Sequence, residues 1–205
     1  DKNYNLSVID SLSKQAATSG AEVIAFHECS ITGYSFARHL SKEQMLELAE
    51  FIPGGESILK LTAIAKKNGI VILAGLFEKD ELDNLYKAYV CVDENGLVAK
   101  YRKLHPFINP HLTTGDSYCI FEIKGWKLGI LICYDNNIIE NVRATKLLGA
   151  DIISTPHVTM CTPSTRPGAG CERAGIGPDK RCLGDRRRAQ CQCQQRDLCL
   201  PSTER

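Results

Sequence analysis

The stretch IVILAGLF, residues 70–77, places eight apolar residues in a row with no polar side chain among them. A continuous apolar run of this length is typical of a strand that is buried on both of its faces. Shorter apolar runs occupy residues 21–26, where Glu22 is the one polar residue, and residues 128–132. We therefore expect a fold in which residues 70–77 form a central strand of a covered sheet.

Segments with helical spacing alternate with these apolar runs. Ser41 followed by Gln44 has the pattern of a capping box, and Asn95-Gly96 is a strong signal for a hairpin turn. Helices are predicted at residues 6–17, 41–50, 56–68 and 138–148. Strands are predicted at residues 21–26, 70–77, 86–92, 97–104, 119–123, 127–133 and 151–155. This order predicts an α/β fold with a mixed sheet.

The charge and the hydropathy pattern of the chain give no indication of binding to nucleic acid or to a membrane. The 205 residues carry a formal net charge of +1, which gives no argument for binding nucleic acid or a membrane surface. No apolar run approaches the ~18 residues that a membrane span needs. The first residues, DKNYNLSVID, lack the pattern of a secretory signal. We expect a cytoplasmic protein that binds neither nucleic acid nor membrane.

Cys133 follows the apolar run 128–132 and precedes an abruptly polar segment. A cysteine in this position is either a small core residue or a nucleophile at the corner between a strand and a helix. A nucleophilic cysteine needs a base for its proton and donors for the oxyanion that forms on attack. Glu28 and Lys103 each stand at the end of a predicted strand and offer such groups. Taken singly, each has an ordinary explanation as a solvated surface residue.

Taken together, these residues resemble the Glu-Lys-Cys triad of the nitrilase, or carbon–nitrogen hydrolase, superfamily, in the same chain order. The likeness extends from about residue 5 to about residue 165. The motifs that carry it are Glu28 with Gly33-Tyr34, Tyr101-Arg102-Lys103-Leu104-His105, Gly129 with Cys133-Tyr134-Asp135, Glu140 and Arg143, and Gly149-Ala150-Asp151-Ile152-Ile153.

The resemblance implies a fold, a reaction and partners. The fold would be an αββα sandwich of mixed sheets, incomplete at both ends. Glu28 would act as general base, Lys103 would stabilise the oxyanion, and Cys133 would form a thioester with an amide, ureido or nitrile substrate. A charged Lys103 would also lower the pKa of the thiol. No metal or organic cofactor is implied, and the folded protein would be a homo-oligomer, such as a dimer.

Several neighbouring residues are further candidates for the site. The backbone N–H of Tyr134 would be a second oxyanion donor, and Asn136, Asn137 and His157 are candidates for substrate contact. Three other residues, His111, Glu140 and Arg143, are expected to give structural support. His111 stands where many members of the family have a second glutamate.

The composition changes after about residue 158, where aromatic residues cease and six of the ten cysteines gather. We therefore expect a partial carbon–nitrogen hydrolase domain at 1–165 and an Arg/Cys-rich tail at 166–205 that is disordered or derived from a frameshifted reading. A zinc site is disfavoured, because the spacing of the cysteines matches no regular ribbon. The cysteines that would form it are Cys182, Cys191, Cys193 and Cys199.

Two other functions stay open at this point. The chain could be a catalytically inactive fragment that needs a partner to fold, because uncovered apolar faces do not stay exposed to water. It could also be a papain-like thiol enzyme in which His105 or His157 serves as the base of Cys133. The second alternative leaves Glu28 and Lys103 without a role.

Overall fold

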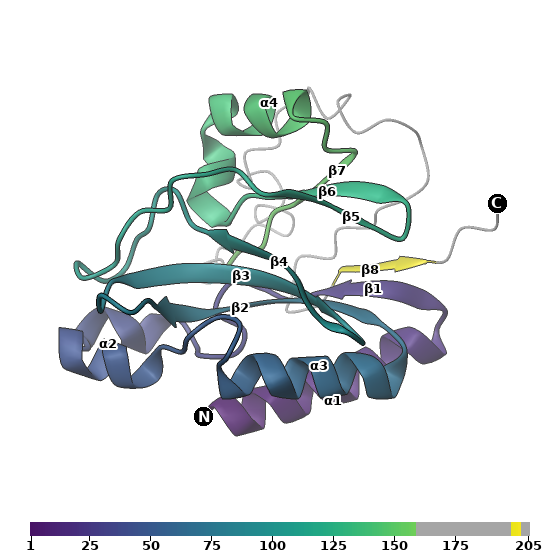
Figure 1. Cartoon of the computed structure of the whole chain (residues 1–205), viewed down its shortest axis with the longest axis horizontal. Coiled ribbons are helices and arrows are strands. Elements are labelled where there is room, and N and C mark those ends of the chain that lie inside the picture. Colours follow the sequence, from purple (N-terminus) through teal and green to yellow (C-terminus); the bar gives the residue numbers. More distant parts are fainter. Residues whose placement is uncertain (159–197, 202–205) are drawn as a thin grey trace, which may run out of the picture.

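The structure is a computed structural model that describes residues 1–158 and 198–201. The expectation for the tail at 166–205 therefore lies outside the described residues, apart from one short strand at 198–201. The described part forms two mixed sheets that lie face to face, with helices on both outer sides (Figure 1). The predicted α/β fold and its αββα layering are thereby confirmed.

The larger sheet has five strands in the order β4-β3-β2-β1-β8. β1 and β2 are parallel, whereas β2 pairs antiparallel with β3, and β3 with β4 across the predicted turn at Asn95-Gly96. The strand bounds are β1 Ala21–Ala25, β2 Val71–Lys79, β3 Leu85–Asp93, β4 Gly96–Arg102 and β8 Leu198–Pro201. The central strand predicted from IVILAGLF is β2, which is buried over eight of its nine residues.

The smaller sheet has three strands in the order β5-β6-β7. β5 (Ile120–Ile123) and β6 (Trp126–Ile130) form an antiparallel hairpin, and β7 (Ile152–Ser154) lies parallel to β6. β6 ends at Ile130, not at residue 133 as predicted. The difference arises because Cys133 adopts a left-handed backbone conformation, with φ of 50°, and begins a 3-10 turn over Cys133–Asn137.

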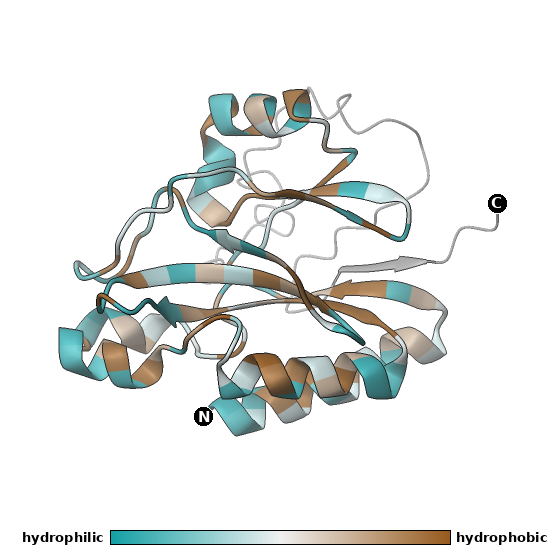
Figure 2. Ribbon diagram, in the orientation of Figure 1, coloured by the Kyte–Doolittle hydropathy of each residue, from teal (hydrophilic) through white to brown (hydrophobic). Residues whose placement is uncertain are grey.

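Successive residues of the central strands face two different apolar layers, one between the two sheets and one between the larger sheet and its helices. On β2, Leu73 faces the smaller sheet and packs in a cluster with Leu128 and Ile130, whereas Ile72 and Ala74 face the helices. Figure 2 shows apolar colouring in both sheets and, interspersed with hydrophilic residues, on the helices that cover the larger one. The strands thus have two buried faces, which explains why their sequences are apolar runs and not alternating patterns.

The helices form the outer layers. They are α1 Lys2–Thr18, α2 Lys42–Leu48, α3 Glu56–Asn68 and α4 Ile139–Leu147. α1 and α3 pack side by side on the larger sheet, and α4 covers the smaller one (Figure 1). α2 begins at the predicted capping box, in which Ser41 and Gln44 each bond the backbone of the other. Within the part of the chain that is described, no helix is long and apolar enough to cross a membrane.

Candidate active site

Cys133 lies where two segments continue beyond the ends of β6 and β7. The Leu131 N–H donates to the Ser154 carbonyl at 3.0 Å, and the Cys133 N–H donates to the Pro156 carbonyl at 2.9 Å. This pairing holds residue 133 beside residue 157. A positive φ is rare and costly for a residue with a side chain, so the turn at Cys133 is held by its surroundings.

Glu28 lies on a turn that follows β1 and packs against β2. The turn is held there by Gly75, whose N–H donates to the Ser30 hydroxyl at 3.1 Å and whose carbonyl accepts from the Ile31 N–H at 3.0 Å. A Cβ atom at position 75 would overlap the backbone nitrogen of Cys29. Glycine at this position therefore permits the close approach that directs Glu28 into the space between the sheets.

Lys103 directly follows β4, and a second lysine, Lys87, lies opposite it on β3. The Lys103 N–H donates to the Lys87 carbonyl at 2.9 Å, so the two residues are cross-strand neighbours. Their ammonium groups approach the same oxygen, Glu28 Oε2, at 3.3 Å from Lys103 and 3.4 Å from Lys87. The three side chains are 0–1% exposed. Sequence reasoning predicted Glu28 and Lys103 but missed Lys87.

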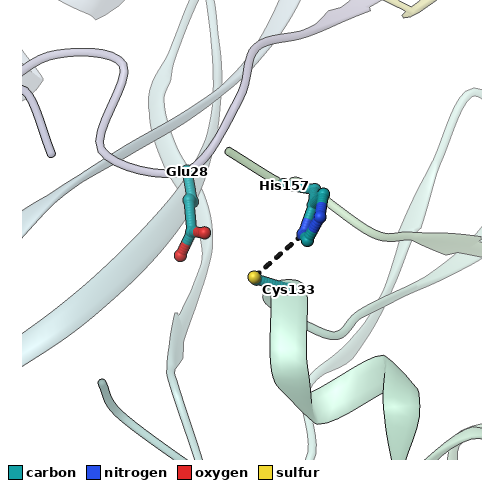
Figure 3. A group of neighbouring side chains, drawn as sticks. All are labelled: Glu28, Cys133 and His157. Atoms are coloured by element: carbon teal, nitrogen blue, oxygen red, sulfur yellow. Dashed lines mark hydrogen bonds between the residues drawn. The ribbon is translucent and has the colours of Figure 1, made fainter. Parts of the chain in front are cut away.

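Three side chains converge from different elements on the space in front of Cys133 (Figure 3). One carboxylate oxygen of Glu28, the Cys133 sulfur and one ring nitrogen of His157 all lie within 4.8 Å of one another. The distance from His157 Nδ1 to Cys133 Sγ is 2.8 Å. The other oxygen of the carboxylate, Oε1, accepts from the Val158 N–H at 3.3 Å.

The electrostatics of the cluster favour an ionised Glu28 and a neutral thiol. Burial raises the pKa of Glu28, but the ammonium groups of Lys103 and Lys87 and hydrogen bonds from Cys133 and Val158 outweigh it, so the pKa lies below its ordinary value. Burial, and then the negative charge of Glu28, raise the pKa of Cys133 to about 12. Burial also lowers the pKa of His157. Lys103 does lower the pKa of the thiol, as expected, but burial and the charge of Glu28 outweigh its effect.

This arrangement suits proton transfer better than metal binding. A carboxylate, a thiol and an imidazole are ligands that zinc accepts. However, two buried ammonium groups already neutralise Glu28, and they would repel a divalent cation at the same position. A thiol beside an ionised carboxylate, in contrast, can lose its proton as it attacks an electrophile.

Asp135 joins the turn that begins at Cys133 to the end of β4. Its carboxylate is fully buried and accepts from the Tyr101 hydroxyl at 2.8 Å, the His105 N–H at 2.9 Å and the Ile132 N–H at 3.3 Å. His105 Nδ1 also lies 3.1 Å from Asp135. His105 is therefore engaged with Asp135, and it is His157 that contacts the cysteine. Asp135 belongs to the quoted motif, but its role was not predicted.

The remaining predicted residues lie at varying depths. Tyr134 and Asn137 are exposed, and Asn136 is half-buried in the turn after Cys133. His111 is exposed in the loop between β4 and β5, away from the buried cluster. Glu140 and Arg143 are exposed on α4, and within the described residues no ion pair joins them.

Comparison with known proteins relates the chain to enzymes. The family model described as carbon–nitrogen hydrolase matches residues 1–174. A nitrilase of Pyrococcus abyssi is 37% identical over 159 residues, and the omega-amidase NIT2 of Homo sapiens is 30% identical over 167 residues. Each match covers 76% of this chain and 58% of the relative. The chain thus spans little more than half of the length of these proteins.

Solved structures share the fold. An amidase from Nesterenkonia sp. superposes with a TM-score of 0.67 at 22% identity, covering 85% of this chain and 66% of that one. Nit3 of Saccharomyces cerevisiae, a member of the nitrilase superfamily, gives a TM-score of 0.66 at 24% identity and covers 76% and 59% of the two chains. At these identities the likeness shows a common fold.

Proposed function

Because the chain belongs to the carbon–nitrogen hydrolase family, we propose that it hydrolyses non-peptide C–N bonds with Cys133 as the nucleophile. The substrate class is a small amide, ureido compound or nitrile, and the named relatives, a nitrilase and an omega-amidase, support this class. The observation that carries the proposal is the buried Glu28 carboxylate, which adjoins the Cys133 thiol and is neutralised by Lys103.

In the acylation step, the Cys133 sulfur attacks the carbonyl carbon of the amide while Glu28 takes the thiol proton. The electron pair of the C=O bond moves onto oxygen and forms a tetrahedral oxyanion. The oxyanion then collapses, the C–N bond breaks, and Glu28 returns its proton to the leaving nitrogen. The products of this step are ammonia or an amine and a thioester on Cys133.

In the deacylation step, Glu28 serves as base a second time. It takes a proton from a water molecule that attacks the thioester carbon, and the C–S bond breaks when the second tetrahedral oxyanion collapses. The proton returns to sulfur, and a carboxylic acid leaves. The raised pKa of Cys133 makes a base necessary at neutral pH, because little thiolate is present before the attack.

Two donors would stabilise the oxyanion. Lys103 would supply one charged N–H, and the backbone N–H of Tyr134, which follows the nucleophile, would supply a second. Both groups belong to segments that Asp135 holds together through Tyr101, His105 and Ile132. A shift of either segment would therefore move a donor relative to the sulfur.

One contact favours a second candidate mechanism, in which His157 and not Glu28 is the base. His157 Nδ1 lies 2.8 Å from the sulfur, and the lowered pKa of His157 leaves the ring neutral at neutral pH and able to accept a proton. This is the Cys-His pair of thiol proteases. It gives the buried Glu28 with its two lysines only a structural role, which is why we prefer Glu28.

The test is ammonia release from a panel of small amides, ureido acids and nitriles. We expect release by the parent, loss with Cys133→Ala and Glu28→Gln, and retention of most activity with His157→Ala. Equal release by the parent and Cys133→Ala would overturn a cysteine mechanism. Retention with Glu28→Gln together with loss in His157→Ala would establish the Cys-His alternative instead.

The remaining alternative is an inactive chain that needs a partner to fold. It is favoured by apolar residues exposed on α4, among them Ile139 and Leu147. Size-exclusion chromatography and a thermal melt test it, since a cooperative transition in a discrete species argues for an autonomous fold. The homo-oligomer and the cytoplasmic location stay predictions.

A further inference from the structure

Lys87 is a fully buried lysine that the proposed mechanism does not use. It lies on β3 in phase with Tyr89 and Cys91, whose side chains pack between the two sheets. A lysine is rarely buried in such a position unless its charge is compensated. Lys103 alone already compensates the charge of Glu28, so a second ammonium group at the same carboxylate requires its own explanation.

The ammonium group of Lys87 is held on three sides. It contacts Glu28 Oε2 at 3.4 Å, donates to the Phe107 carbonyl at 3.2 Å and lies 4.4 Å from the centre of the Tyr34 ring. Two of its three N–H donors are thus directed at the carboxylate and at the carbonyl, and the Tyr34 ring covers a further side of the group. Lys87 is therefore directed at the carboxylate.

Resting on the proposed function, we propose that Lys87 is a positioning residue that fixes the Glu28 carboxylate throughout the reaction and thereby allows Lys103 to donate to the oxyanion. If Lys103 were the only cation at Glu28, its move toward the oxyanion would leave a buried carboxyl group without a charged partner. With Lys87 held by Phe107 and Tyr34, Glu28 keeps one ammonium group at Oε2 at every step.

The net charge of the cluster supports these separate roles, in which Lys87 fixes Glu28 and Lys103 donates to the oxyanion. With a neutral thiol, Glu28, Lys87 and Lys103 together carry one net positive charge. During acylation a single negative charge passes from the carboxylate through the sulfur to the substrate oxygen, and the two ammonium groups remain. A fixed cation beside Glu28 also disfavours the protonated carboxyl group, so it promotes return of the proton to the leaving nitrogen.

The test compares Lys87→Met with Lys100→Met, a matched control on β4 whose lysine pairs with Glu78 at 2.6 Å outside the site. The readout is the rate at which iodoacetamide alkylates Cys133, followed by peptide mass spectrometry as a function of pH. It requires no turnover, so it remains informative if no substrate of the panel is hydrolysed. Groups that face Glu28 and could contribute to the profile are Lys87, Lys103, Cys133, His157, Cys29 and Tyr34.

At low pH the alkylation rate should rise with pH, and we call this rise the acid limb of the profile. We expect the acid limb to move to higher pH in Lys87→Met and to stay at the parent position in Lys100→Met. With acetamide as substrate, we expect kcat to fall on the order of 10²-fold in Lys87→Met while KM changes little, because Lys87 does not touch the substrate. An unchanged acid limb in a folded Lys87→Met protein would overturn the proposal.

A second variant keeps the proposal testable if Lys87→Met fails to fold. In Lys103→Met, Lys87 remains, so a crystal structure of that variant should show the Glu28 carboxylate in its parent position with the Lys87 ammonium group still at Oε2. A displaced Glu28 carboxylate in Lys103→Met would show that Lys87 does not hold it. That result would refute the positioning role without touching the role of Cys133.

Discussion

Tyr101 donates a hydrogen bond to Asp135 at 2.8 Å, and this contact joins β4 to the turn that begins at Cys133. Tyr101 is 1% exposed and Asp135 is fully buried. The bond ties the strand that leads into Lys103 to the turn that carries Cys133. Burial, then the charge of Asp135 and then this hydrogen bond raise the pKa of Tyr101.

Replacement of Tyr101 by Phe should weaken this connection. A hydrogen bond to a buried charged group contributes about 1.5–3 kcal/mol, so we expect the free energy of unfolding of Tyr101→Phe to fall by about that amount. Denaturant titration measures it. The control is Tyr86→Phe, which removes a hydroxyl bonded at 3.2 Å to Asp80 at the edge of the fold. An equal loss in both variants would contradict a special role for the Asp135 contact.

Replacement of Gly75 by Ala should displace the turn that carries Glu28. The added methyl group would overlap the backbone nitrogen of Cys29, and backbone cannot give way as a flexible side chain can. We expect a loss of about 1–3 kcal/mol in the free energy of unfolding, with slower alkylation of Cys133. At Gly54 a methyl group would meet nothing within 4 Å, so Gly54→Ala should change stability by less than about 0.5 kcal/mol. A harmless Gly75→Ala would refute the tight docking of this turn.

The ionisation of Glu28 should make its contribution to stability depend on pH. Its pKa is lowered in the folded protein, so the stabilisation is fully present above the unfolded value of ~4.3 and is lost as pH falls through the folded pKa. The Tm of Glu28→Gln should therefore lie furthest below that of the parent above about pH 5, and the gap should narrow as the pH falls. Glu94→Gln, at an exposed residue in the turn between β3 and β4, is the control. A gap that is independent of pH would contradict an ionised, stabilising Glu28.

The thiol of Cys133 should remain protonated well above neutral pH. Burial and the charge of Glu28 raise its pKa to about 12 in the folded protein, above the ordinary ~8.5 of a cysteine. The difference in ultraviolet thiolate absorbance between the parent and Cys133→Ala cancels the other nine cysteines and should show no thiolate up to about pH 9. Because the folded pKa is raised, stability should fall as the pH rises from the unfolded pKa of ~8.5 toward the folded one, since the thiol then ionises only in the unfolded chain. A thiolate that titrates near neutrality would argue instead for a preformed ion pair with His157.

The parts of the site that could be predicted are polar residues that interrupt or end an apolar run. Glu28 and Cys133 stand out because each follows a buried segment without a turn residue between, and Lys103 directly follows β4. The layering could also be predicted, since strands that are apolar throughout need cover on both faces. Burial and polarity change sharply at those positions, but it was the resemblance to the carbon–nitrogen hydrolase superfamily that marked the three residues as one site.

Lys87 and the position of His157 depend on contacts that no local pattern contains. β3 is buried on both faces, so the phase of Lys87 does not reveal whether it faces the helices or the smaller sheet. His157 reaches the sulfur because pairing between residues 131–133 and 154–156 continues past the ends of both strands. The pairing of β6 with β7 sets that register, and the sequence of either strand alone does not reveal it.

The two sheets contribute different halves of the reactive cluster: Glu28, Lys87 and Lys103 come from the larger one, and Cys133 and His157 from the smaller one. The bond between Val158 and Glu28 closes a loop of 130 residues. Contacts that close such long loops form late in folding, because the chain entropy must be lost before they stabilise anything. The Cys133 thiol therefore meets the Glu28 carboxylate only when the two sheets dock, and we expect a molecule with formed but undocked sheets to carry a Cys133 of ordinary reactivity.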